Sequence, residues 1–424
     1  MEDSNKQTVE HLFRTEYGKV LAIITKYFGV SYIELAEDIV QDALIAAMTD
    51  WSINGTPKNP TAWLVQVAKR KAFNEIKRNK MMHEHHQSEL LAKSSIIDIN
   101  DIFLADEIED SRLRMIFTCC HSDLNLESQI ALTLKILCGF SSKEIAKSLL
   151  TTESTVNKRL YRAKETIRNS NLPFQVPQGN ELLQRLEAVS LTLYLLFNQG
   201  YNSTTGCSII QKELCLEAIR LTKLLVSKFT DNSKMKALLS LMCLHTARFD
   251  ARLDHKGTLV LFADQDRGKW NDELINIGMN YFRQALKGKF LSTYHIEARI
   301  AAEHCLSKSF EDTNWQVIYE QYELLYSLKP NPIIKLNLAI IQSKITGFEQ
   351  SVSMLKALEK SNELRDYYLF PATLGIFSME NSSYKEALNY LKKTLKLSPS
   401  QTEKSYIESK IEICKKMLST TKRC

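Results

Sequence analysis

The sequence has little glycine and little proline. Its 13 glycines and 8 prolines among 424 residues argue against an all-β protein, a glycine-rich nucleotide fold or long disordered tracts. It also lacks an apolar run near the ~18 residues that a membrane span needs, and its polar, acidic start shows no secretory signal pattern. The nine cysteines are odd in number and mostly isolated, which argues against a disulfide framework. These absences predict a cytoplasmic protein, and a length of 424 residues predicts two or three domains.

Charge and motif content narrow the function further. The formal net charge is only +6, so binding to nucleic acid must show in where the basic residues lie. The sequence has no P-loop, Rossmann glycine run, nucleophile elbow or metalloprotease motif, each of which carries a specific chemistry. We therefore expect no enzyme, no cofactor and no metal site.

Apolar residues recur at helical spacing along nearly the whole chain, which predicts an all-α protein. In the first 80 residues we expect one helix before residue 30, a second from about Ser31, and a third up to about Lys80. Asn59 and Pro60 suit the N-cap and first position of the third helix, and the turn-rich residues 52–59 precede it.

The pattern divides the rest of the chain into segments. Residues 81–110 lose the periodicity and predict a linker with at most one short helix. A compact unit follows over 111–170, and two prolines in 171–180 suit a boundary. From 181 to 424 the chain predicts paired helices, and residues 368–401 fit a tetratricopeptide (TPR) unit of ~34 residues. The last segment is therefore predicted to be TPR-like.

The most informative pattern lies between Leu126 and Arg168. Ser141, with Glu144 three residues later, forms a capping box before one short helix, and a second helix begins near Glu153. The second helix is predicted to turn polar and cationic residues outward: Ser154, Thr155, Asn157, Lys158, Arg159 and Arg162. Reading the major groove requires such a face, so the segment predicts a DNA-binding helix-turn-helix. A basic, solvated helix in an ordinary bundle is the alternative.

The third predicted helix carries a second basic face. Its basic residues from 69 to 80 are Lys69, Arg70, Lys71, Lys77, Arg78 and Lys80, and Asn74 lies on the same exposed stripe as Arg70 and Arg78. Trp63 lies near the start of the helix. Basic groups beside an aromatic ring suit melted DNA, whose bases stack on the ring. Trp63 taken alone is better explained as a core residue.

Taken together, these motifs resemble a known family. The chain resembles region 2 of the extracytoplasmic-function (ECF) sigma factors in AEDIVQDALIAAMTDW (36–51) and NPTAWLVQVAKRKAFNEIKR (59–78). It resembles their region 4 in the helix-turn-helix GFSSKEIAKSLLTTESTVNKRLYRAKETIR (139–168). LTLYLLFNQGYNSTTG (191–206) and LVLFADQDRGKW (259–270) look like a subgroup with a long TPR-like helical C-terminal extension. The resemblance implies region 2 over 1–80, region 4 over 111–170 and the extension over 181–424.

The resemblance also implies a role for each candidate residue. Asp38, Gln41 and Asp42 would dock on the clamp helices of the RNA polymerase β′ subunit, and region 4 would meet the β flap. The residues that would read and open the −10 element are Trp63, Arg70, Asn74, Lys77 and Arg78. Those that would read the −35 element are Ser154, Thr155, Asn157, Lys158, Arg159 and Arg162. Without the resemblance, Asp38 and Asp42 are better explained as an acidic, solvated helix face.

Three other clusters carry weaker signals. The run Cys119–His121 has no second ligand pair at zinc spacing, which favours core packing. The histidines at 83, 85 and 86 lie in the predicted linker, which favours solvated side chains. The polar segment His245–Trp270 fits either a pocket for a ligand or partner, or an ion-paired loop that braces two helices, and bracing is favoured.

The sequence therefore predicts an alternative sigma factor that binds core RNA polymerase and promoter DNA, contains no membrane segment and catalyses no reaction. The extension is expected to control it, and an unknown protein or ligand could bind there. Two other functions fit the same residues. A helix-turn-helix repressor or activator with a TPR sensor would bind duplex DNA without polymerase. A TPR scaffold would tolerate neutralisation of Lys158, Arg159 and Arg162.

Overall fold

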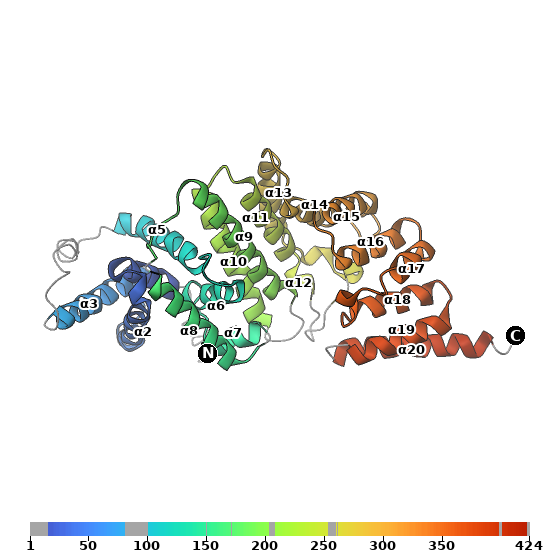
Figure 1. The fold of residues 1–424 in the computed structure, drawn as a ribbon, viewed down its shortest axis with the longest axis horizontal. Coiled ribbons are helices and arrows are strands. Elements are labelled where there is room, and N and C mark those ends of the chain that lie inside the picture. Colours follow the sequence, from blue (N-terminus) through green and yellow to red (C-terminus); the bar gives the residue numbers. More distant parts are fainter. Residues whose placement is uncertain are drawn as a thin grey trace. The chain divides into compact units, whose positions relative to one another are not determined.

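The computed structural model describes residues 16–80, 101–149, 151–170, 172–202, 208–252, 260, 262–397 and 401–421. Every regular element in these ranges is a helix (Figure 1), so the all-α prediction is confirmed. None of the helices in these ranges has the length and apolar character of a membrane span. Residue contacts divide the chain into two compact units, Met1–Phe229 and Thr230–Cys424.

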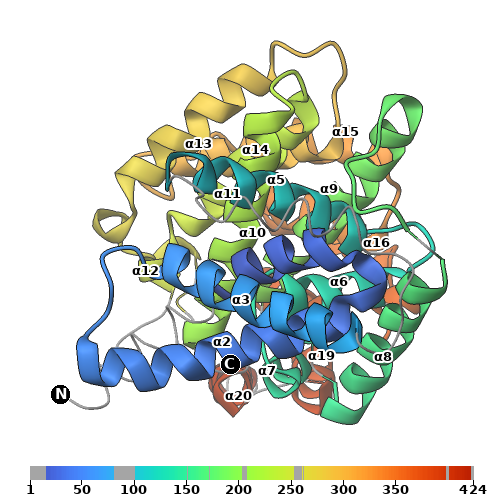
Figure 2. The same ribbon diagram turned by 90° about the vertical axis from the view of Figure 1, so that its left-hand side faces the viewer.

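The first unit begins with a helix that is described from residue 16 to residue 28. It continues with η1 (Val30–Tyr32), α2 (Ile33–Asn54), α3 (Pro60–Lys80), α5 (Asp101–Cys119), α6 (Leu126–Ile136), α7 (Ser142–Ser148), α8 (Glu153–Asn169), α9 (Gly179–Asn202) and α10 (Ser208–Lys228). Figure 2 shows α2 and α3 in the foreground of this unit, with α6, α7 and α8 beside them. Because α9 and α10 belong to this unit, its end at Phe229 lies beyond the boundary predicted at 171–180.

Capping side chains explain where the helices of the first unit begin. Asn59 caps α3 through its side-chain oxygen, and α3 begins at Pro60 as predicted. Ser141 and Glu144 form the predicted capping box at the start of α7, and the Thr152 hydroxyl caps α8. These caps satisfy first-turn amides that have no partner within the helix. The starts of α3, α7 and α8 can therefore be predicted from local sequence.

The structure departs from the predicted segments in two places. First, α2 continues to Asn54, and it ends where Gly55 adopts a φ of 79°, a conformation that is strained for a residue with a Cβ. Second, α5 begins at Asp101, so the end of the predicted linker is helical, while residues 81–100 lie outside the described part of the chain. The buried apolar residues of α5 are Leu113, Met115, Ile116 and Phe117.

The second unit is a series of helices: α11 (Ser233–Thr246), α12 (Phe249–Arg252), η2 (Phe262–Asp264), η3 (Arg267–Lys269), α13 (Asp272–Ala285), α14 (Thr293–Leu306), α15 (Trp315–Leu328), α16 (Pro332–Ile345), α17 (Phe348–Lys356), η4 (Asn362–Leu364), α18 (Leu369–Glu380), α19 (Tyr384–Leu397) and α20 (Gln401–Thr421). The predicted tetratricopeptide unit contains α18 and α19, which pack on each other as a hairpin. Gly375 permits this packing, since a Cβ there would lie 2.8 Å from the Leu391 side chain.

Candidate nucleic-acid and polymerase interfaces

The helix-turn-helix consists of α7 and α8, and both helices contact α6. The residues of α8 that are buried are Val156, Leu160, Ala163 and Ile167. They recur every three or four positions, so they form one apolar stripe and leave the opposite face of α8 to solvent. Thus α8 has the two distinct faces that a helix needs in order to read DNA while anchored to its own domain.

The predicted DNA-reading residues of α8 fall into two groups. The exposed side chains are those of Ser154, Asn157, Lys158 and Arg162. Thr155 and Arg159 are partly buried. The Thr155 hydroxyl shares a 2.8 Å hydrogen bond with Thr152, and Arg159 forms an ion pair with Glu127 of α6. Thr155 and Arg159 therefore hold α8 in place, and the other four face solvent.

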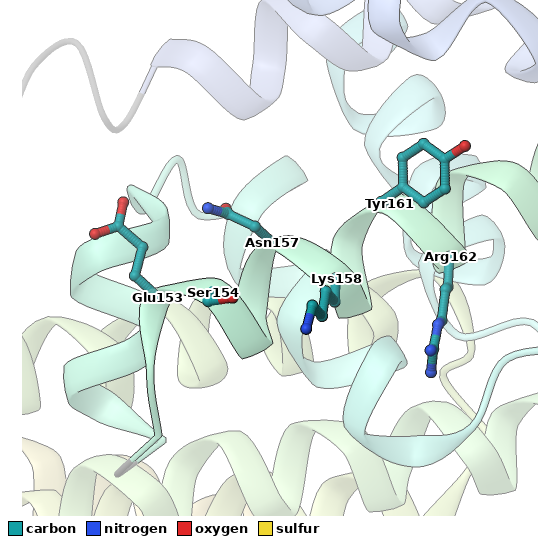
Figure 3. Close-up of a pocket in the computed structure, with 6 residues that line it drawn as sticks. All are labelled: Glu153, Ser154, Asn157, Lys158, Tyr161 and Arg162. Carbon is teal, nitrogen blue, oxygen red and sulfur yellow. The ribbon is translucent and has the colours of Figure 1, made fainter.

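A hollow of about 510 Å³ lies over the exposed face of α8 (Figure 3). Its lining residues are Glu153, Ser154, Asn157, Lys158, Tyr161 and Arg162. Asn157 and Tyr161 point to one side of the helix, and Lys158 and Arg162 point to the other. Tyr161 is 60% exposed and was not predicted. It lies four residues after Asn157, so extending the exposed stripe by one helical turn would have identified it.

A second hollow, of about 390 Å³, lies between α8 and the start of α6. Lys158, Arg159 and Arg162 line it from α8, and Asp123 and Glu127 line it from the other side. A phosphate that approaches this hollow would meet both attraction and repulsion, and Glu127 already neutralises Arg159. The cationic surface that α8 offers to DNA is therefore mainly that of Lys158 and Arg162.

The exposed face of α3 carries an aromatic ring that was not predicted. Arg70 and Asn74 are exposed there as predicted, and Phe73 is 37% exposed. Trp63 is partly buried and packs edge-to-face against Trp51, with ring centroids 5.4 Å apart. Phe73 therefore supplies the exposed ring beside Arg70, three residues away on the same side of the helix. That spacing was the signal that could have identified it.

Two further observations define the basic face of α3. Lys77 and Arg78 lie in its last turn, outside the residues whose side chains the structure describes. Lys69 does not contribute to the exposed face, because its Nζ lies 3.3 Å from Glu107 Oε2 of α5 and burial lowers its pKa. Glu107 also accepts a 3.3 Å hydrogen bond from the Tyr27 hydroxyl. Glu107 thus joins α5 to α3 and to the first helix.

On α2, the predicted Asp38, Gln41 and Asp42 are all exposed. Ile45 and Met48 extend the same face and are 61% and 58% exposed. Residues three and four apart share one side of a helix, so these five residues form a mixed acidic and apolar surface, which we call the α2 strip. Exposed apolar residues that lie together mark protein-binding surfaces. Ile45 and Met48 were missed although both fall outside the buried stripe of α2.

Two ion pairs join α2 to α8. Glu37 is 4% exposed, pairs with Lys164 and accepts a 3.1 Å hydrogen bond from the Tyr17 hydroxyl. Burial and the Glu37 carboxylate raise the pKa of Tyr17, so its hydroxyl remains a donor. Glu34 pairs with Arg168 at 3.6 Å, and both side chains are about half exposed. Helix α8 is thus attached to α2 through its C-terminal half.

Helix α9, in the segment predicted as the extension, contacts the helix-turn-helix unit directly. Thr192 Oγ1 donates to Gln129 Oε1 of α6 at 3.0 Å. The Gln129 side-chain nitrogen donates in turn to two carbonyls of the loop before α6, at 3.0 and 2.9 Å. Arg185 of α9 is 8% exposed and donates to the Phe117 carbonyl of α5. Helix α9 therefore supplies hydrogen-bond donors to a backbone carbonyl of α5 and to a side chain of α6.

The adjacent cysteines are packed in the core. Cys119 and Cys120 are at most 1% exposed, and burial raises the pKa of both thiols, that of Cys120 to about 11. Such thiols are unreactive at neutral pH. In the described part of the chain no group of three or more His, Cys, Asp or Glu side chains could hold a metal ion. The histidines at 83, 85 and 86 lie outside that part.

Three family models match the chain in this order: Sigma-70 region 2 over residues 12–81, Sigma-70 region 4 over residues 114–167, and a family of unknown function, DUF6596, over residues 185–286. An uncharacterized protein of Rhizobium meliloti (strain 1021) is 31% identical over 399 residues, which cover 93% of each chain. No solved structure matches the chain.

The matches agree with the helices described above. The region 2 match contains α2 and α3, the region 4 match contains α6, α7 and all but the last two residues of α8, and the DUF6596 match begins within α9. The resemblance seen in the sequence is therefore confirmed. The chain belongs to the ECF-type sigma factors with a C-terminal extension, a non-enzymatic family whose members bind core RNA polymerase and promoter DNA.

Proposed function

We propose that this chain directs core RNA polymerase to promoters through two DNA-reading surfaces and one polymerase-docking surface. The proposed segments are region 2 over 1–80, a linker over 81–110, region 4 over 111–170 and a regulatory extension over 181–424. The observation that carries the proposal is the exposed face of α8, which lies opposite a continuous buried stripe. A protein with this task would act in the cytoplasm.

On α8, the side chains proposed to read the −35 element are Ser154, Asn157, Lys158 and Arg162. An amide or a guanidinium in the major groove can form paired hydrogen bonds with a base edge, while a lysine neutralises a phosphate. Thr155 and Arg159 would support the geometry of α8 through Thr152 and Glu127.

On α3, Arg70 and Asn74 are proposed to contact the −10 element, together with Lys77 and Arg78. Phe73 adds an exposed ring to this face, and an unpaired base can stack on a ring beside a cation. Trp63 packs on Trp51 of α2, so it would hold α3 in position rather than contact a base.

The α2 strip is proposed to dock on the clamp helices of the polymerase β′ subunit. Asp38 and Asp42 would attract cationic side chains, while Ile45 and Met48 would supply apolar area at the centre of the contact. Region 4 would contact the β flap. Both contacts would place the two DNA-reading helices on one polymerase molecule.

Run-off transcription with purified core polymerase on a genomic promoter library tests the proposal. We expect discrete start sites that share two sequence elements and appear only when the protein is added. Lys158→Ala should weaken promoter binding and reduce its salt dependence by about one released counterion. Lys223→Ala, a change to an exposed lysine of α10, should leave both unchanged. Tight duplex binding without polymerase-dependent initiation would instead indicate a repressor or activator.

The extension is proposed to regulate this activity. Its first helices, α9 and α10, contact α5, α6 and α7 and so support region 4, which leaves residues 230–424 as the part proposed to regulate. Ending the chain after residue 170 would remove Thr192 and Arg185 and so disturb region 4 itself. Ending it at Phe229 keeps the first compact unit whole. If the extension regulates, the 1–229 chain should differ from the full chain in promoter output at equal folded concentration, checked by circular dichroism. Equal output from both chains would count against regulation.

A further inference from the structure

Described residues of the polar segment His245–Trp270 gather around one aromatic ring, that of Phe262. Arg248 Cζ lies 4.9 Å from the Phe262 ring centroid and Arg267 Cζ lies 5.9 Å from it. The rings of His304 and Trp270 lie 4.6 and 6.1 Å away, centroid to centroid. We call Arg248, Phe262, Arg267, Trp270 and His304 the Phe262 cluster. It joins residues of η2 and η3 to the end of α14.

Part of this cluster is a brace. Arg267 Nη1 donates to the carbonyls of His304 and Ser307, at 2.9 and 2.5 Å, and so binds η3 to the C-terminal end of α14. These bonds satisfy two carbonyls that a helix end leaves without intrahelical partners. Bracing was the alternative favoured from the sequence. It explains the hydrogen bonds of Arg267 Nη1 but not the position of Nη2, the other terminal nitrogen of the guanidinium.

Bracing leaves three buried nitrogen atoms unexplained. Arg267 Nη2, Trp270 Nε1 and His304 Nδ1 are buried and have no hydrogen-bond partner. Trp270 as a whole is only 7% exposed, so water at the surface does not reach its nitrogen. Native proteins satisfy nearly all buried polar atoms, and an unsatisfied group indicates a missing partner such as an ion, a ligand or a water.

The electrostatics of the cluster favour an anionic partner. Burial and the neighbouring Arg248 lower the pKa of Arg267, whereas Glu311 and Asp312 act in the opposite direction. Burial, Arg248 and Arg267 lower the pKa of His304 to about 3, so its imidazole is neutral and can donate from Nδ1. Two guanidinium groups near the same two rings raise the local potential. A neutral water would satisfy one or two donors but would not lower that potential.

We propose that the Phe262 cluster binds one small oxyanion, a carboxylate or a phosphate group, which accepts hydrogen bonds from Arg267 Nη2, Trp270 Nε1 and His304 Nδ1. Arg248 contributes its charge from across the Phe262 ring. Charge-assisted bonds from a guanidinium and an indole to one anionic oxygen group are strong and directional. The site lies wholly in the second unit and does not depend on DNA or polymerase binding.

Calorimetric titration of the full chain tests this site, with acetate as the carboxylate probe and inorganic phosphate as the phosphate probe, and with sodium chloride at matched ionic strength as the reference. We expect saturable 1:1 binding of one of the two probes. Trp270→Phe retains an aromatic ring but loses the indole N–H together with the five-membered ring that carries it, so it should weaken that binding about tenfold, the effect of one hydrogen bond to a charged group.

Trp315→Phe provides the matched control. Trp315 belongs to the same group of rings, with its centroid 5.7 Å from that of His304, and its Nε1 is not among the buried nitrogens of the described chain that lack a partner. This variant should bind the probe as the original chain does. Arg267→Lys, which retains the charge but loses the forked geometry, should weaken binding further, and circular dichroism checks that each variant is folded.

Two outcomes would overturn the proposal. One is the absence of saturable binding for both probes, which would leave water as the partner of the three nitrogens. The other is equal weakening, or none, in Trp270→Phe and Trp315→Phe, which would assign the bound anion to another surface such as α8. Saturation by acetate alone or by phosphate alone would support the site and identify which chemistry it selects.

Discussion

The two ion pairs between α2 and α8 allow a quantitative test of how region 4 is attached to region 2. Both pairs join the same two helices, but Glu37 is buried and the Lys164 side chain is only 17% exposed, whereas Glu34 and Arg168 are about half exposed. Lys164→Met keeps an apolar stem of similar length and removes the charge. It leaves the Glu37 carboxylate buried, with the hydroxyl of Tyr17 on the first helix still donating a hydrogen bond to it.

Loss of the Glu37–Lys164 pair and loss of the Glu34–Arg168 pair should differ clearly in their cost to stability. Breaking a buried ion pair by removing one partner costs about 3–5 kcal/mol, because the remaining charge stays desolvated. An exposed pair contributes about 0–1 kcal/mol and is screened by salt. We therefore expect Lys164→Met to destabilise the contact between α2 and α8 strongly and Arg168→Met to change it little. Adding Glu37→Gln to Lys164→Met should recover a large part of the loss.

Hydrogen exchange of the α8 backbone amides, resolved by mass spectrometry, measures this local stability in the full chain. The method suits a protein with two compact units, because exchange reports each helix separately. If Lys164→Met and Arg168→Met changed the protection of α8 by the same amount, or if salt weakened both contacts equally, the assignment of Glu37 as a buried, energetically dominant partner would be wrong.

Further predictions follow from the exposed faces of α3 and α8, which are proposed to read DNA, and from the second unit. Phe73→Ala should reduce open-complex formation, measured by permanganate footprinting, while duplex binding at the −35 element is retained; Phe73→Tyr should behave as the original chain, and an equal loss in both would exclude stacking. Asn157→Ala should lose about 1–3 kcal/mol of discrimination at one base pair, measured by selection from a randomised −35 library, and uniform weakening at every position would argue against base contact. Gly375→Ala should lower the stability of the second unit by about 1–3 kcal/mol in thermal unfolding, because its Cβ would lie 2.8 Å from Leu391; an unchanged midpoint would show that the hairpin adjusts. Since the pKa of His304 is lowered from 6.5 to about 3, the unfolded chain binds more protons between these values, so the second unit should lose stability as pH falls from 6.5 towards 3. His304→Gln should flatten that dependence by up to about 1.4 kcal/mol per pH unit, and an unaltered pH profile would contradict the buried, neutral state.

The sequence predicted the elements that depend on local interactions. The starts of α3, α7 and α8 follow from Asn59, Ser141 and Thr152, each of which caps its own helix. The buried stripe of α8 repeats with the helical period, so it too can be identified from the sequence pattern alone. Local chemistry of this kind lies within a few residues, so it can be identified before the fold is known.

Contacts between distant residues could not be predicted in the same way. Glu37 was assigned no role, yet it pairs with Lys164, 127 residues away in sequence. Periodicity also predicted only the polar residues of the exposed faces of α2 and α3. It missed Ile45 and Phe73, which are apolar residues on those exposed faces. Apolar residues are expected inside, and their exposure is decided by the elements that pack around them.

The packing of α9 on α6 also has a consequence for how the protein is made. Gln129 and its partner Thr192 are 63 residues apart, so at 5–20 residues per second the ribosome adds the second roughly 3–13 s after the first. During that interval the α9-facing side of region 4 lacks its partner in the nascent chain. We therefore expect region 4 to reach its final structure late in synthesis, only after α9 has emerged. Region 4, although it lies in the N-terminal half of the chain, would thus become competent only once part of the extension has been translated.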